Sequence, residues 1–312
     1  MSNKPVLSVV IPVYKSGKHV LELYSRLKAT LKSMNIPFEL VFVEDCGGDS
    51  AWNQLQKVAE TDKDVIIIQH TRNFGQHAAT LCGINNSSGD WIVTIDDDLE
   101  HSPEDIPLLF SEVQKGYDLV YGIFEERSHS KWRNFTSNLA RKVFNVIIPN
   151  MNYDYTGFRI MKQNIAKSLN RFDSSFPFID GYLSWITNNY STVHLQHGIR
   201  GSGESNYSLI KLVKHTFNIF IEFSNIPIKA GTWIGLCSSF VGFVWLIVVI
   251  GSRVLGNISQ SGYPSIMAAI LFFGGIQMFL IGIIGEYIAK INFKTSKKPL
   301  YIVSEFLKGG GK

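Results

Sequence analysis

The chain has 312 residues, 45% of them hydrophobic and 18% charged, and a formal net charge of +4. A chain of this length predicts roughly two domains. The basic excess is small and no groove-reading motif occurs, so we expect no nucleic-acid partner; the basic residues gather instead where anionic lipid headgroups would lie.

Short apolar strands alternate with amphipathic helices in the first part of the chain. This pattern predicts an α/β domain with a mostly parallel sheet that is covered on both faces. The expected strands are Leu7–Val13, Glu39–Val43, Val65–Gln69, Trp91–Ile95 and Leu119–Tyr121. The expected helices are Lys18–Met34, Ala51–Ala59, His77–Asn86 and Glu104–Lys115.

Polar residues collect after the first four of these strands, where ligands bind in such a sheet. They are Pro12 and Tyr14, Glu44 and Asp45, Arg72, and the aspartates after the fourth strand. An aspartate can accept hydrogen bonds from a base or ribose, and Arg72 can meet a phosphate. The set predicts a nucleotide-diphosphate site. The lack of a G-x-G-x-x-G sequence disfavours a dinucleotide site for redox chemistry, and the lack of a Walker A sequence excludes phosphoryl transfer by a P-loop.

The fourth expected strand ends in Asp96, Asp97 and Asp98, with Glu100 close behind. Like charges at this density are unfavourable unless a cation neutralises them, and Mg²⁺ or Mn²⁺ prefers carboxylate and phosphate oxygens. The acidic run therefore predicts a metal site. The alternative is a loop that caps the next helix, with Ser102 or Asp105 near its start and Pro103 in its first turn.

Two long stretches without charge follow later in the chain. They predict transmembrane helices near Thr232–Ser252 and Ser265–Ala289, each long enough to cross a bilayer core of ~30 Å. The alternative is a buried helical hairpin in a soluble domain. Lysines flank both helices on their outer sides, so the positive-inside rule predicts that both termini are cytoplasmic, and no signal peptide precedes Val6.

The segment before the first span, Ser205–Asn225, has apolar residues at helical spacing. It predicts a helix in the membrane interface, or else an amphipathic helix packed on the N-terminal domain. The expected organisation is a cytoplasmic α/β domain over 1–204, an interface helix region over 205–229, two spans with a short external loop over 230–289 and a cytoplasmic tail over 290–312.

Eight ordered segments then carry a family resemblance: VVIPVY, ELVFVEDCGGDS, TRNFGQHAAT, GDWIVTIDDDLEHSPEDIP, TGFRIM, RGSGESNYSLIKL, IGIIGEYI and KKPLYIV. This set resembles the membrane-anchored glycosyltransferase family 2 enzymes that act on polyprenyl phosphate, such as bactoprenol glucosyltransferases and dolichol-phosphate mannose synthase. The resemblance implies a GT-A fold and metal-dependent, inverting transfer of one sugar. The donor would be a nucleotide-diphosphate sugar, most often of UDP, and the acceptor undecaprenyl phosphate at the cytoplasmic leaflet of a bacterial inner membrane.

The resemblance also implies roles for individual residues. Those around the nucleotide sugar would be Pro12, Tyr14, Glu44, Asp45, Arg72 and Asp96, and those around Mg²⁺ or Mn²⁺ would be Asp96, Asp98 and Glu100. Those around the acceptor phosphate would be Arg127, Lys131, Arg133 and Arg200. For Arg127 and Arg133 the alternative is a solvated face. Catalysis would rest on Asp96, Asp98 and Arg200.

One departure from the family pattern concerns the catalytic base. Gly157 stands where the family often has an aspartate, so Asp154 or Asp180 could substitute for it. We include Asp180 among the catalytic candidates, with a helix cap or a contact to a sugar hydroxyl as its alternative roles.

Relatives further imply a homo-oligomer, a tetramer, in the lipid bilayer, and a flippase and periplasmic glycosyltransferase that use the product to modify cell-envelope glycans such as lipopolysaccharide. A different class of function stays open at this point, namely a catalytically silent, membrane-bound sensor of sugar nucleotides or an assembly partner.

Overall fold

The computed structural model describes residues 4–124, 155–172, 177–195, 226–254, 262–296 and 298–310. The chain divides into two compact units. The first comprises Met1–Ser208 together with Lys298–Lys312, and the second comprises Leu209–Lys297. The first unit is therefore built from both ends of the chain.

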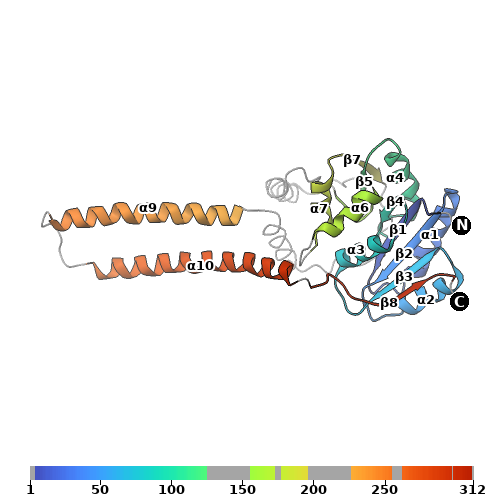
Figure 1. Ribbon diagram of the computed structural model, residues 1–312, viewed down its shortest axis with the longest axis horizontal. Coiled ribbons are helices and arrows are strands. Elements are labelled where there is room, and N and C mark those ends of the chain that lie inside the picture. The colour runs from blue at the N-terminus through green and yellow to red at the C-terminus, as the bar shows by residue number, and fades with distance from the viewer. Residues whose placement is uncertain are drawn as a thin grey trace, which may run out of the picture. The chain divides into compact units, whose positions relative to one another are not determined.

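A sheet of eight strands forms the centre of the first unit (Figure 1). Its strands are β1 (Leu7–Val13), β2 (Phe38–Glu44), β3 (Val65–His70), β4 (Trp91–Thr94), β5 (Leu119–Phe124), β6 (Arg159–Lys162), β7 (Tyr190–Leu195) and β8 (Val303–Lys308). Their order is β7-β5-β6-β4-β1-β2-β3-β8. Neighbouring strands run parallel except where β6 or β8 pairs, so the predicted mostly parallel α/β sheet is confirmed.

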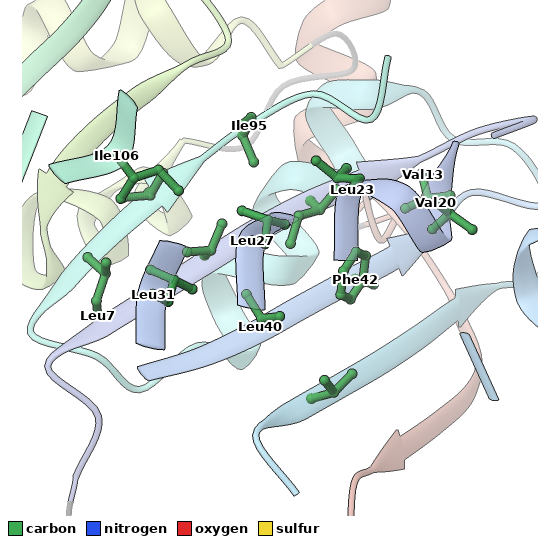
Figure 2. Packing of buried hydrophobic residues seen from close by; sticks show 14 of the residues in the cluster. Leu7, Val13, Val20, Leu23, Leu27, Leu31, Leu40, Phe42, Ile95 and Ile106 are labelled. Carbon is green, nitrogen blue, oxygen red and sulfur yellow. The ribbon is translucent and has the colours of Figure 1, made fainter. Parts of the chain in front are cut away.

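Helices cover both faces of this sheet. They are α1 (Val20–Ser33), α2 (Ala51–Thr61), α3 (Gln76–Asn86), α4 (Ile106–Val113), α6 (Gln163–Ser168) and α7 (Ile179–Ile186). On one face, α1 presents Leu23, Leu27 and Leu31 at helical spacing, all fully buried and directed toward β2 (Figure 2). Each such leucine contributes about 1.5–3 kcal/mol by its burial. On the other face α3 lies so close to β1 that a Cβ at Gly83 would collide with Val10.

The order of the central strands decides where a ligand can bind. Strands β4, β1, β2 and β3 are consecutive neighbours and all parallel, so their carboxyl ends lie along one edge. Strand β1 has its expected bounds, and no end of the other three strands differs from its expected position by more than one residue. The polar residues that follow these strands therefore meet at this edge, as the sequence predicts.

The last strand was not expected. The sequence predicts a tail over 290–312 whose final glycines take no part in the fold, whereas Val303–Lys308 forms β8, antiparallel to β3 at the edge of the sheet. The Gly309 N–H continues this pairing with a 2.7 Å bond to the Val65 carbonyl. Strands so far apart in sequence leave no local signal of their pairing.

The second unit contains two long helices, α9 (Ile226–Val254) and α10 (Tyr263–Thr295) (Figure 1). They include the two expected spans and extend beyond them at both ends. In the part of the chain that the structure describes, one stretch is long and apolar enough to cross a membrane, Phe272–Ala289 in α10, with a mean hydropathy of 1.6. The predicted interface helix, Ser205–Asn225, lies outside the described residues.

Candidate functional site

The aspartate run follows β4 at the carboxyl edge of the sheet, and its middle member is tied to the loop after β1. The backbone N–H of Tyr14 donates to Asp97 Oδ2 at 2.8 Å, and the Ser16 hydroxyl donates to the same oxygen. Lys15 between them has a left-handed backbone, with a φ of 58°. Asp97 thus joins the turns after two neighbouring strands, while Tyr14 stays 45% exposed.

Asp96 is held from the opposite side. Gln76, the first residue of α3, donates its side-chain amide to Asp96 Oδ1 at 2.6 Å. A Cβ placed on Gly157 would lie only 2.7 Å from Asp96 Oδ2. Burial and the nearby charges of Asp98 and Asp97 raise the pKa of Asp96 to about 6. The carboxylates repel one another, so a cation at this place would be favourable.

Asp98 is the exposed member of the run. Its Oδ1 accepts the backbone N–H of Glu100 at 3.0 Å across a turn in which Leu99 has a φ of 60°. This is the one hydrogen bond of Asp98 among the described residues, so its other oxygen lone pairs are available to a ligand. Glu100, the third predicted metal ligand, is partly exposed beside it.

The capping alternative for this loop can be compared with the start of the next helix. Ser102 precedes a 3₁₀ turn, Pro103–Asp105, and Asp105 then occupies the N-cap position of α4. Both lie where the alternative places them, but in the described structure neither makes a side-chain capping bond. The three aspartates before them do not contribute to the cap.

The carboxylates of the acidic run fit a divalent cation that also binds substrate phosphates. Among the described residues, no three His, Cys, Asp or Glu side chains are arranged to hold an ion. Mg²⁺ typically binds through one or two carboxylates together with substrate phosphates, rather than in an all-protein cage. Asp96 and Asp98 supply such a pair, and the set Asp96, Asp98 and Glu100 stays a prediction.

Glu44 and Asp45, at the end of β2, are both buried at 2% exposure. Glu44 accepts the backbone N–H of Gly47 at 2.5 Å and the Gln69 amide at 3.0 Å. Asp45 accepts the backbone N–H groups of Phe74 at 2.9 Å and Gly75 at 2.7 Å. Both carboxylates thus shape the loops of the site, a role that sequence reasoning did not assign to them.

Two further nucleotide-site candidates differ in their exposure. Arg72 is exposed on the loop after β3, with its guanidinium carbon 4.3 Å from the centre of the Phe74 ring. This position suits contact with an anion from solvent. Pro12 is buried within β1, opposite Val43 of β2, so it supports the strand end that carries the site.

Asp180 lies in the first turn of α7 and is not its cap, because Phe178 occupies the N-cap position. Asp180 forms an ion pair with Arg159 of β6, and both are buried. Burial lowers the pKa of Arg159, and the charge of Asp96 opposes this change. Asp180 therefore neutralises a buried guanidinium next to the acidic run, a pairing that the sequence did not indicate.

The predicted acceptor-phosphate residues lie outside the described residues, as does Asp154. They are Arg127, Lys131, Arg133 and Arg200. Their roles stay predictions. Conversely, Gln76 and Ser16 contact the acidic run without having been singled out, although Gln76 is part of the family segment TRNFGQHAAT.

Two protein-family models match this chain. The family described as Glycosyl transferase family 2 matches residues 8–172, and the GtrB C-terminal hairpin matches residues 226–291. The latter match and the apolar helix indicate association with a membrane.

Full-length relatives agree with these matches. The chain is 30% identical to the uncharacterized glycosyltransferase YkcC of Bacillus subtilis, over 98% of this chain and 95% of that protein. It is also 30% identical to the bactoprenol glucosyl transferase of Shigella phage SfII, over 97% and 99%.

Solved structures support the fold. A glucosyl-3-phosphoglycerate synthase from Mycobacterium tuberculosis, solved with Mn²⁺, UDP and phosphoglyceric acid, matches with a TM-score of 0.52 at 16% identity, over 70% of this chain and 76% of that one. The first unit is accordingly a GT-A-like domain.

Proposed function

Because the chain belongs to glycosyltransferase family 2, we propose that it transfers one sugar from a UDP-sugar to undecaprenyl phosphate. The relatives named as bactoprenol glucosyl transferases support this acceptor. The observation that carries the proposal is the acidic run Asp96–Asp98 at the carboxyl edge of the sheet, held by the loop after β1 and by the start of α3.

The loops around this run suit a nucleotide diphosphate. Asp45 fixes the backbone of the loop that carries Arg72, and Arg72 presents an exposed guanidinium that can pair with a phosphate. The exposed Tyr14 ring provides a flat surface at the same edge. Donor binding in this arrangement would involve the six residues that the resemblance implies.

A divalent cation would complete the donor site. Asp96 and Asp98, with Glu100 beside them, would hold Mg²⁺ or Mn²⁺, which would offset the charge of the diphosphate as it leaves. The structural neighbours solved with Mn²⁺ or Mg²⁺ together with UDP support this choice of ions.

The proposed transfer does not need a strong general base. An acceptor phosphate monoester, with a second pKa near ~6, is already largely ionised at neutral pH, so its oxygen can attack the anomeric carbon directly. The bond from that carbon to the diphosphate oxygen breaks as the new bond forms on the opposite face, and the configuration inverts. The protein must then align the reactants and offset the repulsion between two anions, which is the predicted task of Arg127, Lys131, Arg133 and Arg200.

The proposed membrane topology places the catalytic domain and both termini in the cytoplasm, at the inner membrane of a bacterium. Residues on both sides of the hairpin belong to one compact unit with a shared sheet. A chain that leaves and re-enters the same domain crosses a membrane an even number of times, which supports two spans within 230–289. The interface helix over 205–229, a tetramer, a flippase and a periplasmic glycosyltransferase stay predictions.

The proposal is tested by an extraction assay. Purified full-length protein in detergent is mixed with undecaprenyl phosphate, Mg²⁺ or Mn²⁺, and radiolabelled UDP-, GDP- or dTDP-sugars. We expect label from one UDP-sugar to enter the organic phase and to stay in water when a chelator is present. Nucleotide binding without transfer across the panel would contradict the proposal and favour a non-catalytic sensor.

A further inference from the structure

Tyr301, in the KKPLYIV segment that precedes β8, packs against the end of β3. Its ring is stacked on that of His70, with centroids 5.3 Å apart and planes inclined by 13°. Its hydroxyl accepts a hydrogen bond from the Asn85 amide at 2.9 Å. The next residue also takes part, because the Ile302 carbonyl accepts the Thr71 N–H at 3.0 Å.

The other side of this contact leads into the candidate site. The His70 side chain is fully buried, and its Nδ1 lies 2.8 Å from Asp45 Oδ1. A carboxylate can only accept, so Nδ1 carries the hydrogen. Asp45 in turn accepts the Phe74 and Gly75 N–H groups. Tyr301, His70 and Asp45 thus form a continuous chain from the C-terminal segment to the loop 71–75.

This loop determines the position of two groups at the acidic edge. Arg72 is part of it, and Gln76, which donates to Asp96, follows Gly75 directly. Gly75 has a φ of 94°, a backbone conformation that glycine permits but does not enforce. Contacts from outside the loop therefore hold it in place. Removing the support behind Asp45 would loosen both Arg72 and Gln76.

We propose that Tyr301 is a positioning residue for the nucleotide-sugar site, which it acts on through His70 and Asp45, so that the C-terminal segment is a working part of the donor site. This inference rests on the proposed function for the identity of the ligand. The competing explanation is that residues 298–310 only cover the edge of β3. If Tyr301 positions the donor site, replacing Tyr301 affects that site and replacing another residue of the segment does not. If the segment only covers β3, both replacements have the same effect.

Three variants of the full-length protein separate them. Tyr301→Ala removes the stacked ring, and Tyr301→Phe keeps the ring and loses only the hydroxyl, with its hydrogen bonds to Asn85 and Cys82. Phe306→Ala is the matched control, because Phe306 is an aromatic residue on the same segment that pairs with Ile68 and is 48% exposed, away from His70. Thermal unfolding of each variant shows whether it folds.

The first readout is hydrogen exchange of the peptide over residues 71–78 without any ligand. We expect faster exchange in Tyr301→Ala, and wild-type exchange in Tyr301→Phe and Phe306→Ala. The second readout is steady-state transfer, in which Tyr301→Ala raises the KM for the UDP-sugar roughly two- to tenfold, the range that an aromatic pair contributes, and leaves the KM for undecaprenyl phosphate unchanged.

The outcomes distinguish a failure of the inference about Tyr301 from a failure of the proposed function. Unchanged exchange over 71–78 in Tyr301→Ala overturns the inference even if transfer is normal in the wild type. Equal increases of both KM values, or the same effect in Phe306→Ala, also overturn it and assign the segment a structural role. Faster exchange in a protein that transfers no sugar from any donor would instead refute the proposed function and, with it, the ligand assigned to this loop.

Discussion

Gly157 leaves the space that Asp96 occupies: a Cβ on Gly157 would lie 2.7 Å from Asp96 Oδ2 and 2.9 Å from its Oδ1. The family resemblance implies an aspartate at this position. Here a side chain at 157 would have to displace the first carboxylate of the acidic run. A substitution at 157 would therefore also change the position of Asp96.

Gly157→Ala should consequently impair transfer while leaving the fold intact. The atoms that the new methyl meets belong to the end of one side chain, which can move. A displacement of about 1 Å at a reacting site costs roughly 10²-fold in rate, so we expect a fall in kcat of that order at nearly unchanged melting temperature. Steady-state kinetics and calorimetry measure the two effects. The matched control is Gly235→Ala, where a Cβ would meet none of the described atoms within 4 Å, and equal activity of both variants would contradict this account.

Asp98→Ala should abolish transfer without loss of stability or membrane insertion. Asp98 is exposed and its one described hydrogen bond is to the neighbouring Glu100 N–H. Asp97→Ala makes the contrast, because it removes the acceptor of Tyr14 and Ser16 and should cost about 1–3 kcal/mol of unfolding free energy. Transfer and denaturant unfolding are measured on both. Full activity in Asp98→Ala would refute the metal site.

The buried pair Arg159–Asp180 predicts a large loss of stability on truncation of one partner. Asp180→Ala would leave the guanidinium of Arg159 buried without its carboxylate, at a cost of about 3–5 kcal/mol. The double replacement Arg159→Met with Asp180→Leu removes both charges and should recover much of this loss, as a double-mutant cycle in urea would show. If Asp180→Ala kept wild-type stability but lost transfer, Asp180 would act in catalysis instead of in folding.

Acid sensitivity should trace in part to Asp62. Burial opposes its charge, but hydrogen bonds from Lys28 and Tyr24 outweigh this and hold the pKa of Asp62 below its usual 3.8. A carboxyl with a lowered folded pKa stabilises the protein above its unfolded pKa, and this contribution is lost as pH falls through the folded value. Asp62→Asn should therefore unfold at lower temperature at pH 7, with the difference from wild type shrinking below pH ~4. A difference that stays constant with pH would exclude this origin.

The sequence predicted the strands β1 to β4 to within one residue at each end, because continuous apolar runs mark buried parallel strands and polar residues mark their ends. It also placed the acidic run at the correct edge of the sheet. It did not predict β8 or the stacking of Tyr301 on His70, since pairing across more than two hundred residues has no local pattern. The buried Arg159–Asp180 pair was missed for a similar reason, because Asp180 became a catalytic candidate only as a substitute for the aspartate that Gly157 replaces.

The same limit applies to the carboxylates of β2. The position of Glu44 and Asp45 at a strand end predicts contact with a ligand. Asp45 instead accepts three hydrogen bonds from the protein, from the His70 ring and from the backbone N–H groups of Phe74 and Gly75. Loop geometry decides which lone pairs remain for a ligand, and that geometry depends on residues from distant parts of the chain.

The central claim is tested most directly by mass spectrometry of the lipid recovered after reaction of the full-length protein with undecaprenyl phosphate, Mg²⁺ and the active UDP-sugar. The account predicts one product, undecaprenyl phosphate with a single sugar added, and one UDP released for each lipid consumed. Release of UDP at the same rate without the lipid, or a lipid carrying a ladder of sugars, would contradict it.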